Sequence, residues 1–99
     1  MSQTKVAVVI LNWNGKHFLE KFLPFVINYS NESIYSVWVA DNNSTDNSVQ
    51  YIKNNFEQIK IIEFEKNYGF ALGYNKALEQ IEAEYFVILN SDVEVTQNW

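Results

Sequence analysis

Consecutive apolar residues alternate along the chain with segments in which apolar residues recur every three or four positions. Three apolar runs, VAVVIL (6–11), YSVWVA (35–40) and YFVIL (85–89), are rich in β-branched and aromatic residues. Such runs are typical of strands that are covered on both faces. A fourth run, IKIIEF (59–64), contains charged residues and predicts a strand close to the edge of a sheet.

Helical patterns occupy the intervals between these runs. Segments 16–30 and 70–82 each present one apolar stripe at helical spacing. Pro24 lies inside the first of them, and because proline removes an amide donor and crowds the preceding turn, we expect a kink or a restart close to it.

The second helix is expected to begin directly after Asn43. The three residues that follow, Ser44, Thr45 and Asp46, all carry oxygens suited to capping a helix N-terminus. The resulting order is strand, helix, strand, helix, strand, helix, strand. Parallel neighbours need a long connection, which a helix supplies. The sequence therefore predicts one α/β domain over 1–99, with an open, mainly parallel, Rossmann-like sheet of about four strands and helices on both faces.

Composition and charge narrow the range of ligands. The chain is 47% hydrophobic and 16% aromatic, which suffices for a core, and its seven lysines and twelve acidic residues give a net charge of -5. This balance argues against nucleic acid, which needs clustered cations. An anionic nucleotide would then be held by backbone amides, helix N-termini and a metal ion.

Cysteine is absent, so any metal would be bound by oxygen. The first apolar run (6–11) is too short for a signal-peptide core or a transmembrane segment. A cytoplasmic location is therefore expected.

Polar residues follow each of the four predicted strands, in segments 12–15, 41–46, 67–70 and 90–92. Open α/β sheets bind ligands beyond the carboxyl ends of their strands, so we expect all four segments at one rim. Turn formation or helix capping explains each segment taken alone. Their convergence favours a nucleotide site.

Chemical roles follow from the residue types. Asn12 and Trp13 offer backbone groups and a flat surface to a base, and Asp41 can accept hydrogen bonds from a base N–H or a ribose hydroxyl. Gly69 permits a positive φ before a helix start, which favours phosphate oxygens. Asp92 supplies a hard oxygen of the kind that Mg²⁺ or Mn²⁺ takes.

The segments VVILNWNG, VWVADNNSTDNS, NYGFALGYN and FVILNSDVEV closely resemble the N-terminal, nucleotide-binding half of family 2 glycosyltransferases. The similarity is greatest to the bacterial rhamnosyltransferase-like branch that builds cell-surface polysaccharide. It spans 6–95 and implies a GT-A fold, a divalent cation (Mg or Mn) and inversion at the anomeric carbon. The implied donor is a nucleotide-diphosphate-sugar of the UDP, dTDP or GDP type, and the implied acceptor is a glycan or a lipid-linked glycan.

The resemblance also assigns positions. It implies that Asn12 and Asp41 lie at the nucleoside with Asn42 and Ser44 in the same loop, and that Asn67, Gly69 and Asn75 lie near ribose and diphosphate. With Trp13 and Asn90, these are the predicted nucleotide-binding residues. Asn90-Ser91-Asp92 matches the Asp-x-Asp element, with Asn90 in place of its first acid, and Asp92 is the predicted metal ligand.

In this family the general base that deprotonates the acceptor comes from a following segment, which would lie after residue 99. We therefore expect no catalytic residue within the chain and little transfer activity by the chain alone. A full-length enzyme would be cytoplasmic or loosely associated with the inner face of the membrane. Apolar surface left uncovered in the shorter chain predicts self-association.

Two other interpretations stay open. A sugar-nucleotide pyrophosphorylase should carry a basic Gly-rich loop after the first strand, and a dinucleotide-dependent oxidoreductase a G-x-G-x-x-G there; residues 12–16 are neither. A non-catalytic α/β module such as a receiver domain needs an acidic cluster around the ends of the first and third strands and a late lysine. Here the third strand ends on Phe64-Glu65, with no matching aspartate.

Overall fold

The structure is a computed structural model, and it describes residues 6–28 and 35–90. Strands and helices alternate in the order β1 (Val6–Asn12), α1 (Lys16–Asn28), β2 (Tyr35–Asp41), α2 (Ser48–Asn55), β3 (Ile59–Glu63), α3 (Phe70–Glu79) and β4 (Tyr85–Asn90). The predicted α/β class and the predicted order of elements are confirmed.

The four strands form one parallel sheet in the order β3-β2-β1-β4. The chain adds β2 and β3 on one side of β1 and then returns to place β4 on the other side. This reversal makes the carboxyl end of β1 the switch point at which ligands bind in open sheets. The weakly alternating strand β3 lies at an edge, as its sequence predicts.

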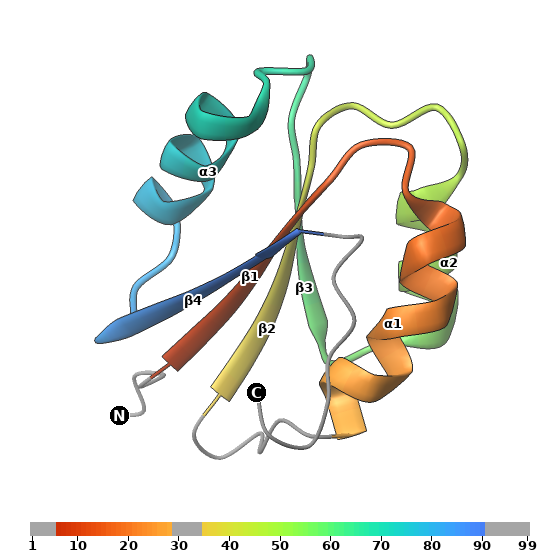
Figure 1. Ribbon diagram of the computed structural model, residues 1–99, viewed down its shortest axis with the longest axis horizontal. Coiled ribbons are helices and arrows are strands. Elements are labelled where there is room, and N and C mark those ends of the chain that lie inside the picture. The colour runs from red at the N-terminus through yellow and green to blue at the C-terminus, as the bar shows by residue number, and fades with distance from the viewer. Residues whose placement is uncertain (1–5, 29–34, 91–99) are drawn as a thin grey trace.

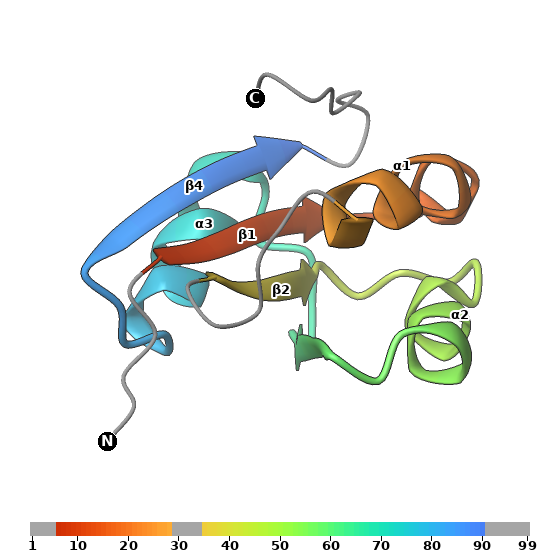
Figure 2. The same ribbon diagram turned by 90° about the horizontal axis from the view of Figure 1, so that it is seen from below.

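The helices cover both faces of the sheet. Figure 1 shows α1 and α2 on one side and α3 on the other, and Figure 2 shows α1 and α2 side by side. The core beneath α1 and α2 contains Val8, Ile10, Leu19, Leu23, Val26, Val37, Val39, Ile52 and Ile59. The core beneath α3 contains Ala7, Val9, Leu11, Ala40, Ile62, Phe64, Tyr74, Ala77 and Ile81. Successive residues of β1 point to opposite cores, which explains its uninterrupted apolar run.

The predicted start of α2 is wrong. The helix begins at Ser48, and its N-cap, Asn47, is left-handed (φ 67°) and makes no side-chain capping bond. Of the oxygens expected to cap it, Ser44 Oγ accepts from Asn14 N and Asp46 Oδ2 accepts from Lys16 N at the start of α1, whereas Asp46 Oδ1 still accepts from the amide of Ser48, the first residue of α2. Tertiary partners therefore occupy Ser44 and share Asp46 with the start of the helix.

Two other helix predictions differ in detail. α1 is one helix that runs through Pro24, so the restart that was one of the two predicted outcomes is absent, whereas the kink stays a prediction. Leu23 and Val26 on either side of the proline are buried. α3 ends at Glu79, three residues before the predicted position.

On β4, Phe86 and Ile88 align with Ala7 and Val9 of the α3 core, yet both are exposed. They are a candidate surface for self-association, which stays a prediction. No helix within residues 6–28 and 35–90 is long and apolar enough to cross a membrane.

Candidate functional site at the carboxyl edge of the sheet

Strand register aligns the ends of the four strands at one rim. Asn12 pairs with Asp41, Asp41 pairs with Glu63, and Leu11 pairs with Asn90. The loops after β1 and β2 leave this edge together and run side by side toward α1 and α2 (Figure 1). The polar segments predicted to converge after β1, β2 and β3 therefore do meet.

A buried hydrogen-bonded group made of Asn12, Asp41 and Ser44 lies at the centre of the rim. Asn12 is 0% exposed and Asp41 is 3% exposed. Asn12 Nδ2 donates to Asp41 Oδ1 (2.9 Å) and to Ser44 Oγ (3.2 Å). Ser44 donates to Asp41 through its backbone N (2.8 Å) and its hydroxyl (2.7 Å). These bonds fix the direction of the Asp41 carboxylate.

One atom of this group stays without a partner in the described part of the chain: the side-chain oxygen of Asn12 (Oδ1), which is buried. A buried acceptor of this kind is costly unless something bonds to it. The strand position opposite Asn12 on the β4 side falls after Asn90, outside the described residues.

Side chains from each loop bond to the backbone of the other. Ser44 Oγ accepts from Asn14 N (2.8 Å), and Asn14 Oδ1 accepts from Thr45 N (2.7 Å). Asp46 Oδ2 accepts from Lys16 N (2.9 Å). The β1–α1 and β2–α2 loops are thus tied together by side chains that no local pattern assigns to this role.

The hydrogen bonds between the two loops change the pKa of Asp46. Partial burial raises the pKa of its carboxyl, but hydrogen bonds from the Ser48 side chain and from the Lys16 and Ser48 amides outweigh burial. The net pKa lies below the ordinary value. The ionised form is therefore the one that the fold stabilises.

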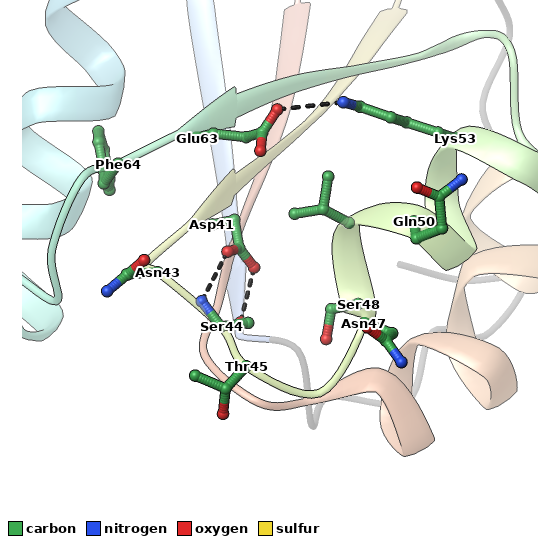
Figure 3. Close-up of a pocket in the computed structure, with 11 residues that line it drawn as sticks. Asp41, Asn43, Ser44, Thr45, Asn47, Ser48, Gln50, Lys53, Glu63 and Phe64 are labelled. Carbon is green, nitrogen blue, oxygen red and sulfur yellow. Dashed lines mark hydrogen bonds and ion pairs between the residues drawn. The ribbon is translucent and has the colours of Figure 1, made fainter.

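A pocket of about 310 Å³ opens beside Asp41, between β2, α2 and β3 (Figure 3). Asn43, Ser44 and Thr45 line one side of it, and the exposed ion pair between Lys53 and Glu63 (Nζ–Oε2 3.2 Å) lies on another. Its volume is near the lower end of the range of about 300–1,000 Å³ for small-molecule sites. Asp41 is the only buried carboxylate among the described residues that line it.

The loop before α3 brings a second set of predicted residues to the rim. Asn67 Oδ1 accepts a hydrogen bond from Gly69 N (2.7 Å), which is a local turn of the Asx type. Gly69 has φ 80° and ψ -172°, a conformation that residues with a Cβ rarely adopt. Asn42, which is buried, bonds to the backbone of this loop as well.

Cations and an acid surround Tyr68 in the same loop. The ammonium groups of Lys66 and Lys76 lie 5.2 and 4.6 Å from the ring centroid. The Tyr68 hydroxyl donates to Glu65. This bond lowers the pKa of the Glu65 carboxyl and raises the pKa of the Tyr68 phenol. Two lysines and one acid therefore give the surroundings of Tyr68 a net positive charge on an otherwise acidic chain.

The predicted nucleotide residues separate into three groups. Asn12, Asp41, Asn42 and Ser44 form the buried or half-buried interior of the rim, and Asn67 and Gly69 form the loop beside it. Trp13 (56% exposed) and Asn75 project from the surface. The side chain of Asn90, and the whole of Asp92, lie outside the described residues.

Sequence reasoning missed Asn14 and Gly73. Asn14 joins the two loops, a role that depends on a partner thirty residues away and leaves no local signal. Gly73 did leave one, because a glycine inside a helix costs stability and usually marks a close approach. A Cβ on Gly73 would lie 3.0 Å from Leu11 Cδ1 and 3.1 Å from Asn42 Nδ2.

Within residues 6–28 and 35–90, no group of three or more His, Cys, Asp or Glu side chains could hold a metal ion. The predicted ligand, Asp92, is outside these ranges.

The sequence model for glycosyl transferase family 2 matches residues 7–99. The chain belongs to this family. It is 29% identical over 90 residues to the putative teichuronic acid biosynthesis glycosyltransferase TuaG of Bacillus subtilis, which covers 88% of this chain and 35% of TuaG. It is 25% identical over 95 residues to the teichoic acid poly(glycerol phosphate) polymerase of Staphylococcus epidermidis, covering 92% of this chain and 13% of the polymerase. The chain thus spans about a third or less of these relatives.

Solved structures of glycosyltransferases share the fold. TarS from S. aureus in complex with UDP-GlcNAc superposes with a TM-score of 0.85 at 23% identity, over 96% of this chain and 28% of TarS. The mannosyltransferase PcManGT from Pyrobaculum calidifontis, in complex with GDP-Man and Mn²⁺, gives a TM-score of 0.80 at 22% identity, over 97% and 30%. The predicted GT-A fold is confirmed. The assignment to the rhamnosyltransferase-like branch stays a prediction.

Proposed function

We propose that this chain forms the donor-binding part of a glycosyltransferase active site, in an enzyme that transfers a sugar from a nucleotide-diphosphate-sugar during synthesis of cell-surface polysaccharide. One observation carries the proposal: the buried Asp41 carboxylate, held by Asn12 and Ser44, lines a pocket at the carboxyl edge of the sheet, on the strand next to the switch point at β1. The relatives TuaG and the teichoic acid polymerase, named for cell-wall polymer synthesis, support the same class.

The nucleoside is proposed to bind beside Asp41. Its carboxylate accepts hydrogen bonds from Asn12 and Ser44, and two carboxylate oxygens have about four acceptor positions in all. One position is left for a base N–H or a ribose hydroxyl. The exposed ring of Trp13, which follows β1 at the same rim, offers an apolar face to the base. Uridine, thymidine and guanosine all present such a donor.

The diphosphate is proposed to lie against the loop before α3, with Asn67 and Gly69 beneath it. Backbone amides at the start of a helix attract anions, and Lys66 and Lys76 add positive charge there. A Mg²⁺ or Mn²⁺ ion held by Asp92, with Asn90 as a neutral neighbour, would neutralise the phosphates. PcManGT, which was solved with Mn²⁺, has the same fold.

Other features of the full reaction are also proposals. We infer inversion at the anomeric carbon, a glycan or lipid-linked acceptor, and a cytoplasmic site of action. We further expect little sugar transfer by the 99-residue chain alone, because the family resemblance implies that the general base comes from a segment after residue 99. Family membership leaves the pyrophosphorylase and receiver-domain interpretations without support.

Calorimetric titration of UDP, dTDP and GDP into the chain, with and without Mn²⁺, tests the proposal. We expect one of the three to bind in a metal-dependent manner. Asp92→Ala should abolish the metal dependence, whereas the matched variant Glu94→Ala, which removes an acid two residues away, should keep it. A chain that is folded by circular dichroism and binds none of the three nucleotides would refute the donor-site assignment.

A further inference from the structure

The side chain of Asn42 hydrogen-bonds to the backbone of two consecutive residues, Tyr68 and Gly69, in the loop before α3. Its Nδ2 donates to the carbonyl of Gly69 (3.1 Å), and its Oδ1 accepts from the amide of Tyr68 (3.2 Å). Asn42 is only 3% exposed. Both polar atoms of the carboxamide therefore already bond to protein, at a position that the sequence resemblance predicts to be a nucleotide-binding residue.

The backbone of Asn42 is itself fixed to the sheet. Its amide donates to the carbonyl of Asn12 at the end of β1 (2.8 Å). The carbonyl of the preceding residue, Asp41, accepts from Phe64 N just after β3 (2.9 Å). Asn42 thus links the carboxyl ends of β1, β2 and β3 to the loop before α3.

The start of α3 depends on the same contact. The Gly69 carbonyl, which accepts from Asn42, also accepts the helical hydrogen bond from Gly73 N (3.2 Å). Gly73 leaves just enough room for this arrangement, since a Cβ there would lie 3.1 Å from Asn42 Nδ2. Contacts of that length require one of the two groups to move.

We propose that Asn42 is a positioning residue whose two side-chain hydrogen bonds hold the loop 67–69 and the N-terminus of α3 at a fixed place relative to Asp41. We call this pair of bonds the latch, and we propose that Gly73 provides the space that it needs. The inference rests on the proposed function, because the latched backbone is the part proposed to face the diphosphate. Only a side chain with a donor and an acceptor satisfies both bonds. An aspartate at position 42 keeps the acceptor for Tyr68 and loses the donor for Gly69.

Nuclear magnetic resonance of the nucleotide-free chain tests the latch directly. In Asn42→Ala, exchange of the Tyr68 amide proton should accelerate at least about fivefold, the effect of losing one hydrogen bond. In Asn42→Asp, that amide should stay within about twofold of wild type, while the carbonyl carbon resonance of Gly69 shifts. A merely destabilised protein would accelerate exchange in both variants. Asn54→Ala, which removes an exposed amide from α2, is the matched control and should change neither signal.

The link to nucleotide binding uses Gly73→Ala, which leaves Asn42 chemically intact. Both Gly73→Ala and Asn42→Ala should shift the Tyr68 and Gly69 resonances and weaken UDP binding in the presence of Mn²⁺ by at least about fivefold, on the same hydrogen-bond scale.

Unchanged exchange of the Tyr68 amide in Asn42→Ala would overturn the latch. Weaker UDP binding with an unmoved loop would overturn it too, since Asn42 would then contact the ligand itself. A wild-type chain with the expected exchange behaviour and no nucleotide binding would refute the donor-site assignment and leave the latch standing.

Discussion

Replacement of Asp41 by alanine should lower the free energy of unfolding more than a typical single substitution, because it removes several hydrogen bonds at once. The change removes the acceptor for Asn12 Nδ2 and for the backbone and hydroxyl donors of Ser44. Hydrogen bonds to a charged group are worth about 1.5–3 kcal/mol each. They are not additive, and losing a buried charge also removes its desolvation cost.

The access of water to the abandoned donors determines how much free energy of unfolding Asp41→Ala loses. The Ser44 donors are half-buried and can turn to water, whereas Asn12 is fully buried and keeps only its 3.2 Å bond to Ser44 Oγ. We therefore expect Asp41→Ala to lower the free energy of unfolding by about 3 kcal/mol. A domain of this size has about 5–15 kcal/mol in all, so the variant should still fold.

Urea unfolding followed by tryptophan fluorescence measures this loss, and the midpoint of thermal unfolding should fall by about 12–24 °C. Asp41→Asn, which keeps one acceptor, should lose roughly half as much. Glu63→Gln is the matched control, because it removes an exposed carboxylate from the same pocket and breaks only a surface ion pair with Lys53. Such pairs contribute about 0–1 kcal/mol. If Asp41→Ala lost no more than Glu63→Gln, water would be replacing the buried bonds and the reasoning would fail.

Three further predictions concern the loops. Gly69→Ala should cost about 1–3 kcal/mol in urea unfolding, because its φ of 80° disfavours a Cβ although no atom lies within 4 Å of one; a loss below about 0.5 kcal/mol would contradict this. The lowered pKa of Asp46 means that its ionised form stabilises the fold above the ordinary pKa of about 4 and that this contribution disappears as the pH falls. The stability difference between wild type and Asp46→Asn should therefore shrink from pH 7 to acid pH, and a pH-independent difference would count against it. Tyr68→Phe should raise the pKa of Glu65 toward its ordinary value, since the hydrogen bond from the Tyr68 hydroxyl is the main cause of the lowered pKa. Carboxyl carbon resonances followed through a pH titration measure this pKa, and the same pKa in wild type and Tyr68→Phe would contradict the prediction.

The sheet and its polar rim were predictable from sequence because their signals are local and repeated. Long apolar runs identified the central strands β1 and β2, and charged residues within 59–64 marked the edge strand β3. The same kind of run in β4 was wrongly predicted to be covered on both faces, because β4 lies at the other edge of the described sheet with Phe86 and Ile88 exposed. Once the strands were parallel, their polar ends had to share one edge. Asn12 and Asp41 were therefore expected together, and they are in hydrogen-bond contact at 2.9 Å.

The start of α2 could not be predicted in this way, because the choice of partner is tertiary. Ser44 and Asp46 have the chemistry of helix caps, yet Ser44 Oγ bonds to the amide of Asn14 and Asp46 divides its two oxygens between the amides of Lys16 and Ser48. Local sequence does not reveal that the amides of Asn14 and Lys16 are within reach. The same limit applies to Asn42, whose partners lie 26 and 27 residues away.

The rim has an inner and an outer layer, and this division decides which substitutions should change chemistry and which should change shape. Asn12 and Asn42 are buried and bonded to protein, so we expect variants there to act by moving loops. Trp13, Asn67 and the backbone around Gly69 are exposed, and they are available to touch a ligand. On a chain of net charge -5, a diphosphate needs oriented amides and cations more than side-chain acids. The inner layer would then serve to hold those amides in place, which is why the latch at Asn42 should matter for binding without contact.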